Sequence, residues 1–366
     1  MRYSRQIILP ELGTEGQAAL QKARVLCIGA GGLGCAALPY LAAAGVGTLG
    51  ICDDDQVELS NLQRQVLFKT AEAGKPKAEL AAAALRGLNP EIGVKVHATR
   101  LSPENALALF AEYDIILDGS DNFAAKFLIN DAAAKLDKPW VYGAVLGFEG
   151  QVSVFHSKHG PCYRCLYGEA PKNPVANCAE AGVLGAFVGV VGALQAVEVL
   201  KLAAKRPQLT PLLGKLLMLD ARDWQIHEMA LASSPSCPIC STKPENIRLT
   251  ISNNACSTFS ASDPSIPEIS AEDAVKLKMP FFLDVREPHE WSEGHVRAAK
   301  HIPLGTLLSQ TAPELPREGD LIVYCRGGTR SKKALQHLRK LGFTNGKNLT
   351  GGFVSFSGAH PEQCEA

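Results

Sequence analysis

Four cysteines in two CxxC pairs have the most specific spacing in the chain. Cys162 and Cys165 form the first pair, and Cys237 and Cys240 form the second. A zinc ion bound by four thiolates is tetrahedral and leaves no position open for a substrate. Two unrelated redox or buried pairs are the alternative, but two CxxC pairs in one chain are typical of a metal site. We therefore expect a structural zinc ion, contributing on the order of 10 kcal/mol to folding.

A fifth cysteine stands between a predicted strand and a predicted helix. The strand covers residues 321–324, Cys325 follows it, and the segment RGGTR leads into a helix that begins near Ser331. Backbone N–H groups at the helix N-terminus, with Arg326 and Arg330, would favour the thiolate and make Cys325 a nucleophile. Cysteine phosphatases have a longer loop, so this tighter ring suits sulfur transfer.

A glycine-rich segment, GAGGLG at residues 29–34, follows a predicted strand at 24–28 and opens a predicted helix at 33–44. Asp53 ends the next strand, as a dinucleotide-binding fold requires. Glycines let the backbone approach phosphate at a helix N-terminus. The candidate nucleotide-binding residues here are Gly29, Gly31, Gly32, Gly34 and Asp53. On this motif alone, an NAD-dependent dehydrogenase is the leading interpretation.

Polar residues in three later segments change that balance. They are Ser60, Asn61 and Arg64 in SNLQRQ, Lys77 in KPKAE, and Asp121 and Asn122 in DGSDN. A triphosphate needs cations and a carboxylate that holds magnesium, and Arg64, Lys77 and Asp121 fit those roles. Singly, the two cations could be surface charges and Asp121 a helix N-cap. Asp54 and Asp55 are expected to be solvated turn acids.

Composition excludes several other classes of protein. The 37 basic residues balance the 37 acidic ones, so no net field attracts nucleic acid or an anionic membrane. The N-terminus lacks the pattern of a signal peptide. The apolar stretch 183–204 carries Gln195, Glu198 and Lys201 at helical spacing, which predicts a core helix with one wet edge rather than a membrane span. Eleven cysteines without a disulfide framework favour the cytoplasm.

The alternation of strand-like and helix-like segments up to residue 136 predicts an α/β fold, a Rossmann-like doubly wound sheet that is mostly parallel. Further strands are expected at 151–155, 216–220 and 224–229. We predict a first domain at 1–241, a Ser-, Asn- and Pro-rich linker at 242–267 and a smaller α/β domain at 268–360. The smaller domain should hold strands at 281–284 and 321–324.

Taken together, YSRQ at residues 3–6, GAGGLG, SNLQRQ, KPK and DGSDN resemble the ordered motifs of the MoeB/ThiF adenylyltransferases, relatives of ubiquitin-activating enzymes. The resemblance covers about residues 1–240. It implies that ATP is the nucleotide, that Asp53 holds the ribose, and that the polar residues above line the ATP and magnesium site. It also implies that Arg5 reaches the ATP of a partner subunit in a homodimer, and that the four cysteines bind zinc.

The C-terminal segment carries a second resemblance. CRGGTR at residues 325–330, with DVREPHEW at 284–291 and GHVRAAKHIP at 294–303, is similar to an active rhodanese domain, in which the loop cysteine carries a persulfide. Cys178 alone would be read as a buried, inert thiol. In fusions of these two families, a cysteine at its position takes the acyl group as a thioester or resolves the acyl disulfide.

The resemblance therefore implies ATP-dependent adenylation of the C-terminal glycine of a ubiquitin-like sulfur carrier, of the molybdopterin, thiamine or tRNA-thiolation type. Sulfur from a persulfide on Cys325 would then give a thiocarboxylate. Thiosulfate or a cysteine-desulfurase persulfide would be the sulfur donor. Two alternatives remain, namely an activator that passes a thioester at Cys178 to a target lysine, and an NAD-dependent oxidoreductase.

Overall fold

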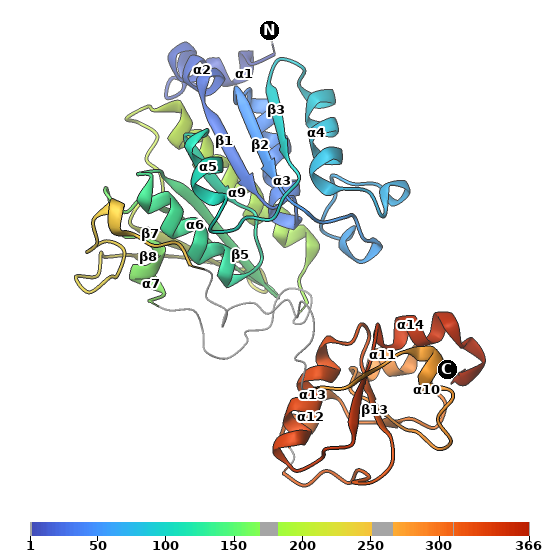
Figure 1. Ribbon diagram of the computed structural model, residues 1–366. Coiled ribbons are helices and arrows are strands. Elements are labelled where there is room, and N and C mark those ends of the chain that lie inside the picture. The colour runs from blue at the N-terminus through green and yellow to red at the C-terminus, as the bar shows by residue number, and fades with distance from the viewer. Residues whose placement is uncertain (1, 169–181, 251–265, 310, 366) are drawn as a thin grey trace. The chain divides into compact units, whose positions relative to one another are not determined.

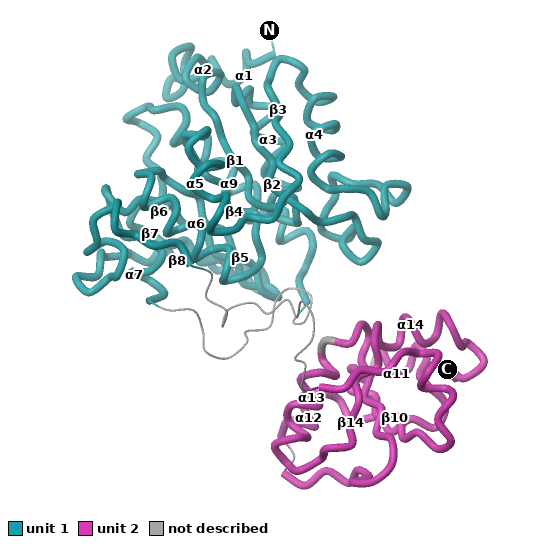
Figure 2. Tube along the Cα trace, viewed as in Figure 1, with its two compact units in different colours: residues 1–257 teal, residues 258–366 magenta. Residues whose placement is uncertain are grey.

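The computed structural model describes residues 2–168, 182–250, 266–309 and 311–365 (Figure 1). The chain divides into two compact units, residues 1–257 and 258–366 (Figure 2). Cys178 and Cys256 lie outside the described residues. Each unit is described by itself below.

The first unit is built on one eight-stranded sheet with the strand order β3-β2-β1-β4-β5-β6-β7-β8. Strands β1 to β5 pair in parallel, and β6 to β8 extend the sheet by antiparallel pairing. The strands are β1 (Arg24–Ile28), β2 (Thr48–Cys52), β3 (Gly93–His97), β4 (Ile115–Asp118), β5 (Trp140–Leu146), β6 (Glu149–Phe155), β7 (Lys215–Asp220) and β8 (Gln225–Ala230). This confirms the predicted mostly parallel, Rossmann-like α/β fold.

Helices cover both faces of this sheet, and each face has its own apolar core. They are α1 (Ser4–Ile7), α2 (Gly13–Lys22), α3 (Gly32–Ala44), α4 (Lys77–Leu88), α5 (Ala106–Ala111), α6 (Phe123–Lys135), α7 (Tyr163–Leu166) and α9 (Gly185–Ala204), with 3-10 turns at Leu59–Asn61, Thr70–Glu72 and Pro244–Asn246. One core includes residues of α3, α4 and α9, and the other includes residues of α5 and α6.

Helix α9 is long and apolar enough to cross a membrane, but half of it is buried within this unit, where it packs along α3 and β5. The predicted core helix is therefore confirmed, whereas its expected wet edge is wrong for Gln195 and Glu198, which are both buried. Gln195 donates a hydrogen bond to the Asp118 carbonyl at 2.7 Å. Glu198 accepts from the Leu212 N–H at 2.7 Å and from Lys201 at 2.6 Å. These bonds compensate the burial of Glu198 and of the Gln195 amide nitrogen, whereas Gln195 Oε1 has no hydrogen-bond partner among the described atoms.

The second unit has a parallel five-stranded sheet with the order β12-β10-β13-β14-β9. The strands are β9 (Glu268–Ile269), β10 (Phe281–Asp284), β12 (Lys300–His301), β13 (Leu321–Tyr324) and β14 (Gly346–Leu349), and β11 (His295–Val296) pairs separately with β15 (Cys364–Glu365). The helices are α10 (Ala271–Ala274), α11 (Pro288–Ser292), α12 (Leu304–Ser309), α13 (Thr329–Lys340) and α14 (Gly352–Ala359), with a 3-10 turn at Pro361–Gln363. The smaller α/β unit is thus confirmed.

Candidate active sites

The glycine loop joins β1 to α3 with little space between its backbone and its surroundings. Gly29 has φ +94°, and a Cβ there would lie 2.8 Å from the carbonyl oxygen of Gly119. A Cβ on Gly34 would overlap the carbonyl oxygen of Gly29. A Cβ on Gly31, in contrast, would have the Gly119 carbonyl oxygen, at 3.7 Å, as its nearest neighbour. The loop is therefore closely packed at its ends and open at Gly31, beside the N-terminus of α3, where an anion is favoured.

Asp53 connects this loop to the end of β2. Its Oδ2 accepts a hydrogen bond from the Ala30 N–H at 2.7 Å, and its Oδ1 accepts one from the Asp55 N–H at 2.8 Å. Burial raises the pKa of the Asp53 carboxyl, although both N–H groups act in the opposite direction. Asp53 thus fixes the shape of the glycine loop in addition to any contact with a ribose.

Lys77 is the first residue of α4 and is only 4% exposed. Its Nζ lies 3.2 Å from Oδ2 of Asp55, an exposed carboxylate. The prediction that Asp55 is only a solvated turn acid is therefore wrong, because its carboxylate pairs with the buried Lys77 ammonium group. Asp54 is also paired, at 3.2 Å from Arg100.

Arg64 lies across the same loop from the neighbouring turn. The position of a Cβ on Gly32 would be 3.4 Å from Arg64 Cγ, and the guanidinium donates to the Ser60 carbonyl at 3.3 Å. Among the described residues no acidic partner is recorded for Arg64, so its charge is available to an anion. Ser60 and Asn61 hydrogen-bond to each other at 3.2 Å on the same turn.

The segment after β4 supplies the predicted metal-binding carboxylate. Asn122 is the N-cap of α6, since its side chain accepts from the Ala125 N–H at 2.9 Å. The alternative reading of Asp121 as this cap is therefore wrong. Asp121 is exposed, and the described residues include no ion-pair partner for it. A free carboxylate at the end of β4 is suited to magnesium, whose preferred ligands are oxygens.

Two buried residues beside the nucleotide loops were missed in the sequence. Lys126 is 5% exposed, and its Nζ lies 2.6 Å from Asp118 Oδ2 and 2.8 Å from the Gly143 carbonyl, so that it supports the loop after β4. Gln65 is buried near Gly31, and its Oε1 has no hydrogen-bond partner among the described atoms. Such an orphaned amide beside an open glycine loop is consistent with a polar ligand at this position.

Arg5 lies far from the glycine loop of its own chain. It is exposed on α1, and the neighbouring Tyr3 packs against Gly45, immediately beyond the C-terminal end of α3. Figure 1 shows α1 at the amino end of β1. Because α3 has 13 residues, its two ends are about 20 Å apart. Arg5 therefore lies at the opposite end of α3 from the glycine loop of its own chain.

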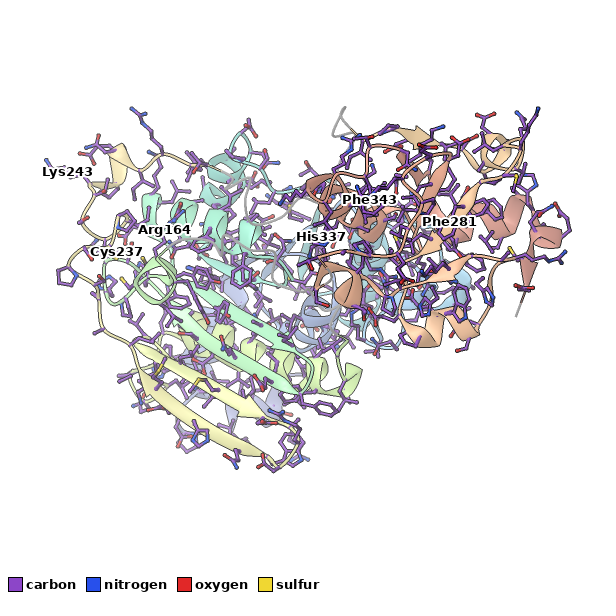
Figure 3. The ribbon with its side chains drawn as sticks, turned by 90° about the horizontal axis from the view of Figure 1, so that it is seen from below. Arg164, Cys237, Lys243, Phe281, His337 and Phe343 are labelled. Carbon is purple, nitrogen blue, oxygen red and sulfur yellow. The ribbon has the colours of Figure 1, made fainter. Side chains whose placement is uncertain are left out.

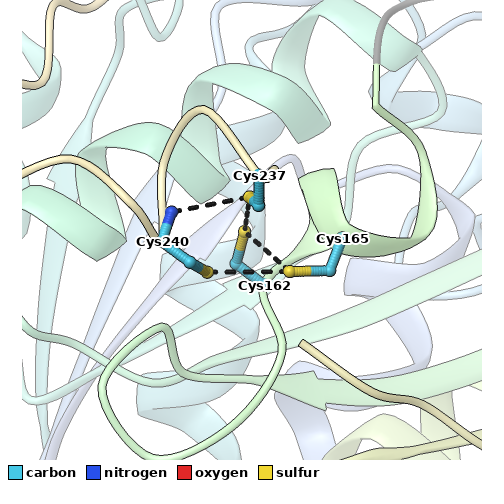
Figure 4. A group of neighbouring side chains, drawn as sticks. All are labelled: Cys162, Cys165, Cys237 and Cys240. Carbon is cyan, nitrogen blue, oxygen red and sulfur yellow. Dashed lines mark hydrogen bonds between the residues drawn. The ribbon is translucent and has the colours of Figure 1, made fainter. Parts of the chain in front are cut away.

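The four predicted zinc ligands meet in space, although the pairs are far apart in the sequence (Figure 4). The Sγ atoms are 3.9 Å apart for Cys162 and Cys165, 3.5 Å for Cys162 and Cys237, and 3.6 Å for Cys165 and Cys240. Zinc–sulfur bonds of about 2.3 Å in a tetrahedron separate the sulfurs by about 3.8 Å. The cluster therefore fits zinc in both donor type and spacing.

An ion pair with a buried carboxylate connects this cluster to helix α6. Arg164, between the first two ligands, makes a two-point contact with Asp131 of α6, at 2.8 and 2.7 Å. Figure 3 shows Arg164 on the same side of the unit as Cys237. Asp131 is almost fully buried, so the pair is shielded from water.

The thiol of Cys325 is 1% exposed and lies at the N-terminus of α13. The Gly328 N–H donates to its Sγ at 3.1 Å, and the Ser331 hydroxyl is 3.5 Å away. Gly328 can do so because it adopts φ +97°, which favours glycine. The exposed residues Arg326 and Gly327 form the outer part of the loop. Negative charge on this sulfur is thus stabilised by backbone and hydroxyl donors.

Arg330 is bound by a carboxylate that the sequence did not reveal. Its two terminal nitrogens lie 2.6 and 2.7 Å from the carboxylate oxygens of Glu290 on α11. Burial alone would raise the pKa of Glu290, but hydrogen bonds from Arg330 and from the Glu287 N–H outweigh it and lower the pKa to about 2. Much of the Arg330 charge is therefore neutralised before it can act on Cys325.

Family models match both units of the chain. Residues 3–239 match the ThiF family, and residues 269–359 match the rhodanese-like domain. The chain belongs to the ThiF family. It is 41% identical over 366 residues to the probable adenylyltransferase/sulfurtransferase MoeZ of Mycobacterium tuberculosis, covering 97% of this chain and 92% of that one. Identity to adenylyltransferase and sulfurtransferase MOCS3-2 of Zea mays is 39%, covering 97% and 78%.

A shorter relative matches the ThiF unit alone. The sulfur carrier protein adenylyltransferase of Thermus thermophilus is 47% identical over 249 residues, covering 66% of this chain and 91% of its own. The crystal structure of E. coli MccB with ATP has a TM-score of 0.58 at 24% identity, covering 66% and 75% of the two chains, and so shares the fold. This ThiF-family chain is accordingly an adenylyltransferase and sulfurtransferase, not a dehydrogenase.

The remaining cysteines of this ThiF-family chain are of two kinds. Cys27, Cys35 and Cys52 are buried in the sheet and its helices. Burial raises the pKa of Cys35 and of Cys52 to about 12, which leaves them protonated and inert. Cys364 lies in β15 and is half-buried.

Proposed function

We propose that this enzyme adenylates the C-terminal glycine of a ubiquitin-like sulfur carrier and then converts it to a thiocarboxylate. The observation that carries the proposal is the Cys325 sulfur, which accepts a backbone N–H at a helix N-terminus in the same chain as a ThiF-family unit. A carboxylate is a poor electrophile, so activation by ATP must precede attack by sulfur.

In the adenylation step, a carboxylate oxygen of the carrier attacks the α-phosphorus of ATP, and pyrophosphate leaves. Arg64 and Lys77 offer positive charge to the departing phosphates, joined by Arg5 from a partner subunit in a homodimer. Asp121 and Asn122 would hold magnesium, which supplies further charge neutralisation to the phosphates. The glycine loop, Ser60, Asn61 and Asp53 would position the nucleotide.

In the transfer step, Cys325 receives a sulfane sulfur from thiosulfate, releasing sulfite, or from a cysteine-desulfurase persulfide. The terminal sulfur of the persulfide attacks the acyl adenylate, AMP leaves, and an acyl disulfide joins the carrier to Cys325. The Cys178 thiolate then attacks the Cys325 sulfur, which releases the thiocarboxylate and leaves a disulfide between the two cysteines. A cellular dithiol reductant must restore both thiols.

The four-cysteine cluster would hold a structural zinc ion, because all four sulfurs are needed to complete a closed tetrahedral site. Every cysteine of the described residues is a free thiol. Free thiols accord with the reducing cytoplasm, where we place the enzyme. We expect no nucleic acid or membrane partner, since the chain carries no net charge.

The test combines two assays on purified full-length enzyme. With ATP, magnesium and a Gly-Gly-ending carrier, we expect labelled pyrophosphate to exchange into ATP. With thiosulfate added, the intact mass of the carrier should show replacement of one oxygen by sulfur. The Cys325→Ala variant should keep exchange and lose the sulfur product. If the carrier were instead passed through Cys178 to a target lysine, Cys325→Ala would leave formation of the carrier–lysine conjugate unchanged.

A further inference from the structure

Two histidines and one aspartate converge on the ThiF unit, outside both the nucleotide loops and the cysteine cluster. Asp137 follows the C-terminal end of α6, and His156 and His159 lie in the turn after β6. One ligand atom from each residue lies within 4.8 Å of the other two. His156 Nε2 is 3.0 Å from Asp137 Oδ1, and the two imidazole rings are 4.5 Å apart.

These distances suit a divalent ion. Bonds of about 2.1 Å to nitrogen and oxygen, at a right angle, place the two ligand atoms about 3.0 Å apart. This is the separation already present between His156 and Asp137. An ion could therefore replace the proton of the His156–Asp137 hydrogen bond with little movement of either side chain. Imidazole and carboxylate ligands select a transition metal such as zinc or nickel, whereas the cysteine cluster is a softer, all-sulfur site.

The backbone holds the three ligands in place. His159 and Gly160 donate their N–H groups to the His156 carbonyl at 3.0 and 2.9 Å, which closes the turn. Asp137 adopts φ +52°, an uncommon conformation for a residue other than glycine. The carboxylate is thus presented to His156 by a tight turn.

The groups around the cluster have opposite effects on metal binding. Burial lowers the pKa of His156, although Asp137 acts against this, and a neutral imidazole is the form that binds metal. Lys158 opposes binding, since its Nζ lies 2.9 Å from the other oxygen of Asp137. Asp137 and His159 are both exposed, so water can complete the coordination of an ion.

We propose that Asp137, His156 and His159 form a second metal site, for a divalent transition metal ion, which joins the turn after α6 to the turn after β6. The segment from His156 to Cys165 would then carry ligands for two ions of different chemistry.

The test uses the untagged full-length chain, with its cysteine-bound zinc measured beforehand, titrated with nickel chloride in a calorimeter. The wild type should bind one further ion per chain. Loss of an outer partner of a metal ligand typically weakens binding by about 10- to 100-fold. His159→Ala removes a ligand, Asp137→Asn removes the negative charge of another, and each should weaken binding by at least about tenfold. Lys158→Ala should tighten it, because the competing cation is removed.

His227→Ala is the matched control, since it removes an exposed histidine of β8 that is outside the cluster. It should bind nickel as the wild type does. Unchanged cysteine-bound zinc and pyrophosphate exchange would show that each variant is folded. The proposal is wrong if the wild type takes up no ion beyond the cysteine-bound one, or if both ligand variants bind nickel with wild-type affinity.

Discussion

Replacing Glu290 with glutamine tests how the thiol loop of the rhodanese-like unit is held. The pKa of Glu290 falls from 4.5 to about 2 in the folded chain, and one pKa unit corresponds to about 1.4 kcal/mol. The carboxylate form therefore stabilises the unit by about 3 kcal/mol. Its side chain is only 10% exposed, so screening by water is limited. Glu290→Gln also leaves the partly buried Arg330 guanidinium without its counter-charge.

We expect Glu290→Gln to lose about 3 kcal/mol of stability at pH 7. Because the folded pKa is depressed, this stabilisation is complete above the unfolded pKa of 4.5 and disappears as the pH falls toward 2. The wild type should therefore lose stability between about pH 5 and pH 2, and the variant should lose less over the same range. Native-state hydrogen exchange of the β13 amides measures the second unit within the full chain.

Arg339→Gln is a suitable control, because this partly exposed arginine of α13 is not part of the Glu290 pair. It should change β13 protection by less than about 0.5 kcal/mol. A Glu290→Gln variant with wild-type protection at pH 7, or with an unchanged acid dependence, would refute the reasoning. It would mean that Arg330 finds an equivalent partner elsewhere.

Three further changes have clear expected outcomes. Lys126→Met leaves Asp118 buried and unpaired, so unfolding of the ThiF unit in urea should become about 3–5 kcal/mol easier, with loss of pyrophosphate exchange. Cys237→Ser should abolish stoichiometric zinc in elemental analysis and lower the melting temperature of the ThiF unit, since one of four ligands is lost. Gly34→Ala places a methyl group against the Gly29 carbonyl, and should weaken ATP binding in calorimetry without removing zinc.

The parts of the fold that are local in sequence could be predicted from the residues. The glycine loop, the Cys325 loop and the CxxC pairs each lie within a few residues, and their positions in the fold follow from the flanking strand and helix. Helix α13 shows the limit of this reasoning, since it was expected to begin near Ser331 and begins at Thr329. Strand β6 was expected at 151–155 and begins two residues earlier, at Glu149.

The parts of the site that depend on tertiary contacts could not be predicted in this way. Glu290 and Arg330 are 40 residues apart, and neither residue type indicates the other as a partner. Gln195 was assigned to a wet edge because it is polar, yet its partner is a backbone carbonyl at the end of β4. A buried polar group is recognised only when the donors and acceptors around it are known.

The placement of Arg5 at the far end of α3 has a consequence for how the enzyme responds to its own concentration. If Arg5 acts on the ATP of a partner subunit, as proposed above, adenylation would be second order in enzyme at low concentration. Dilution would then abolish adenylation activity by separating the subunits, before any subunit unfolds. Mixing one variant defective in Arg5 with another defective in Lys77 would restore one intact site in each hybrid pair.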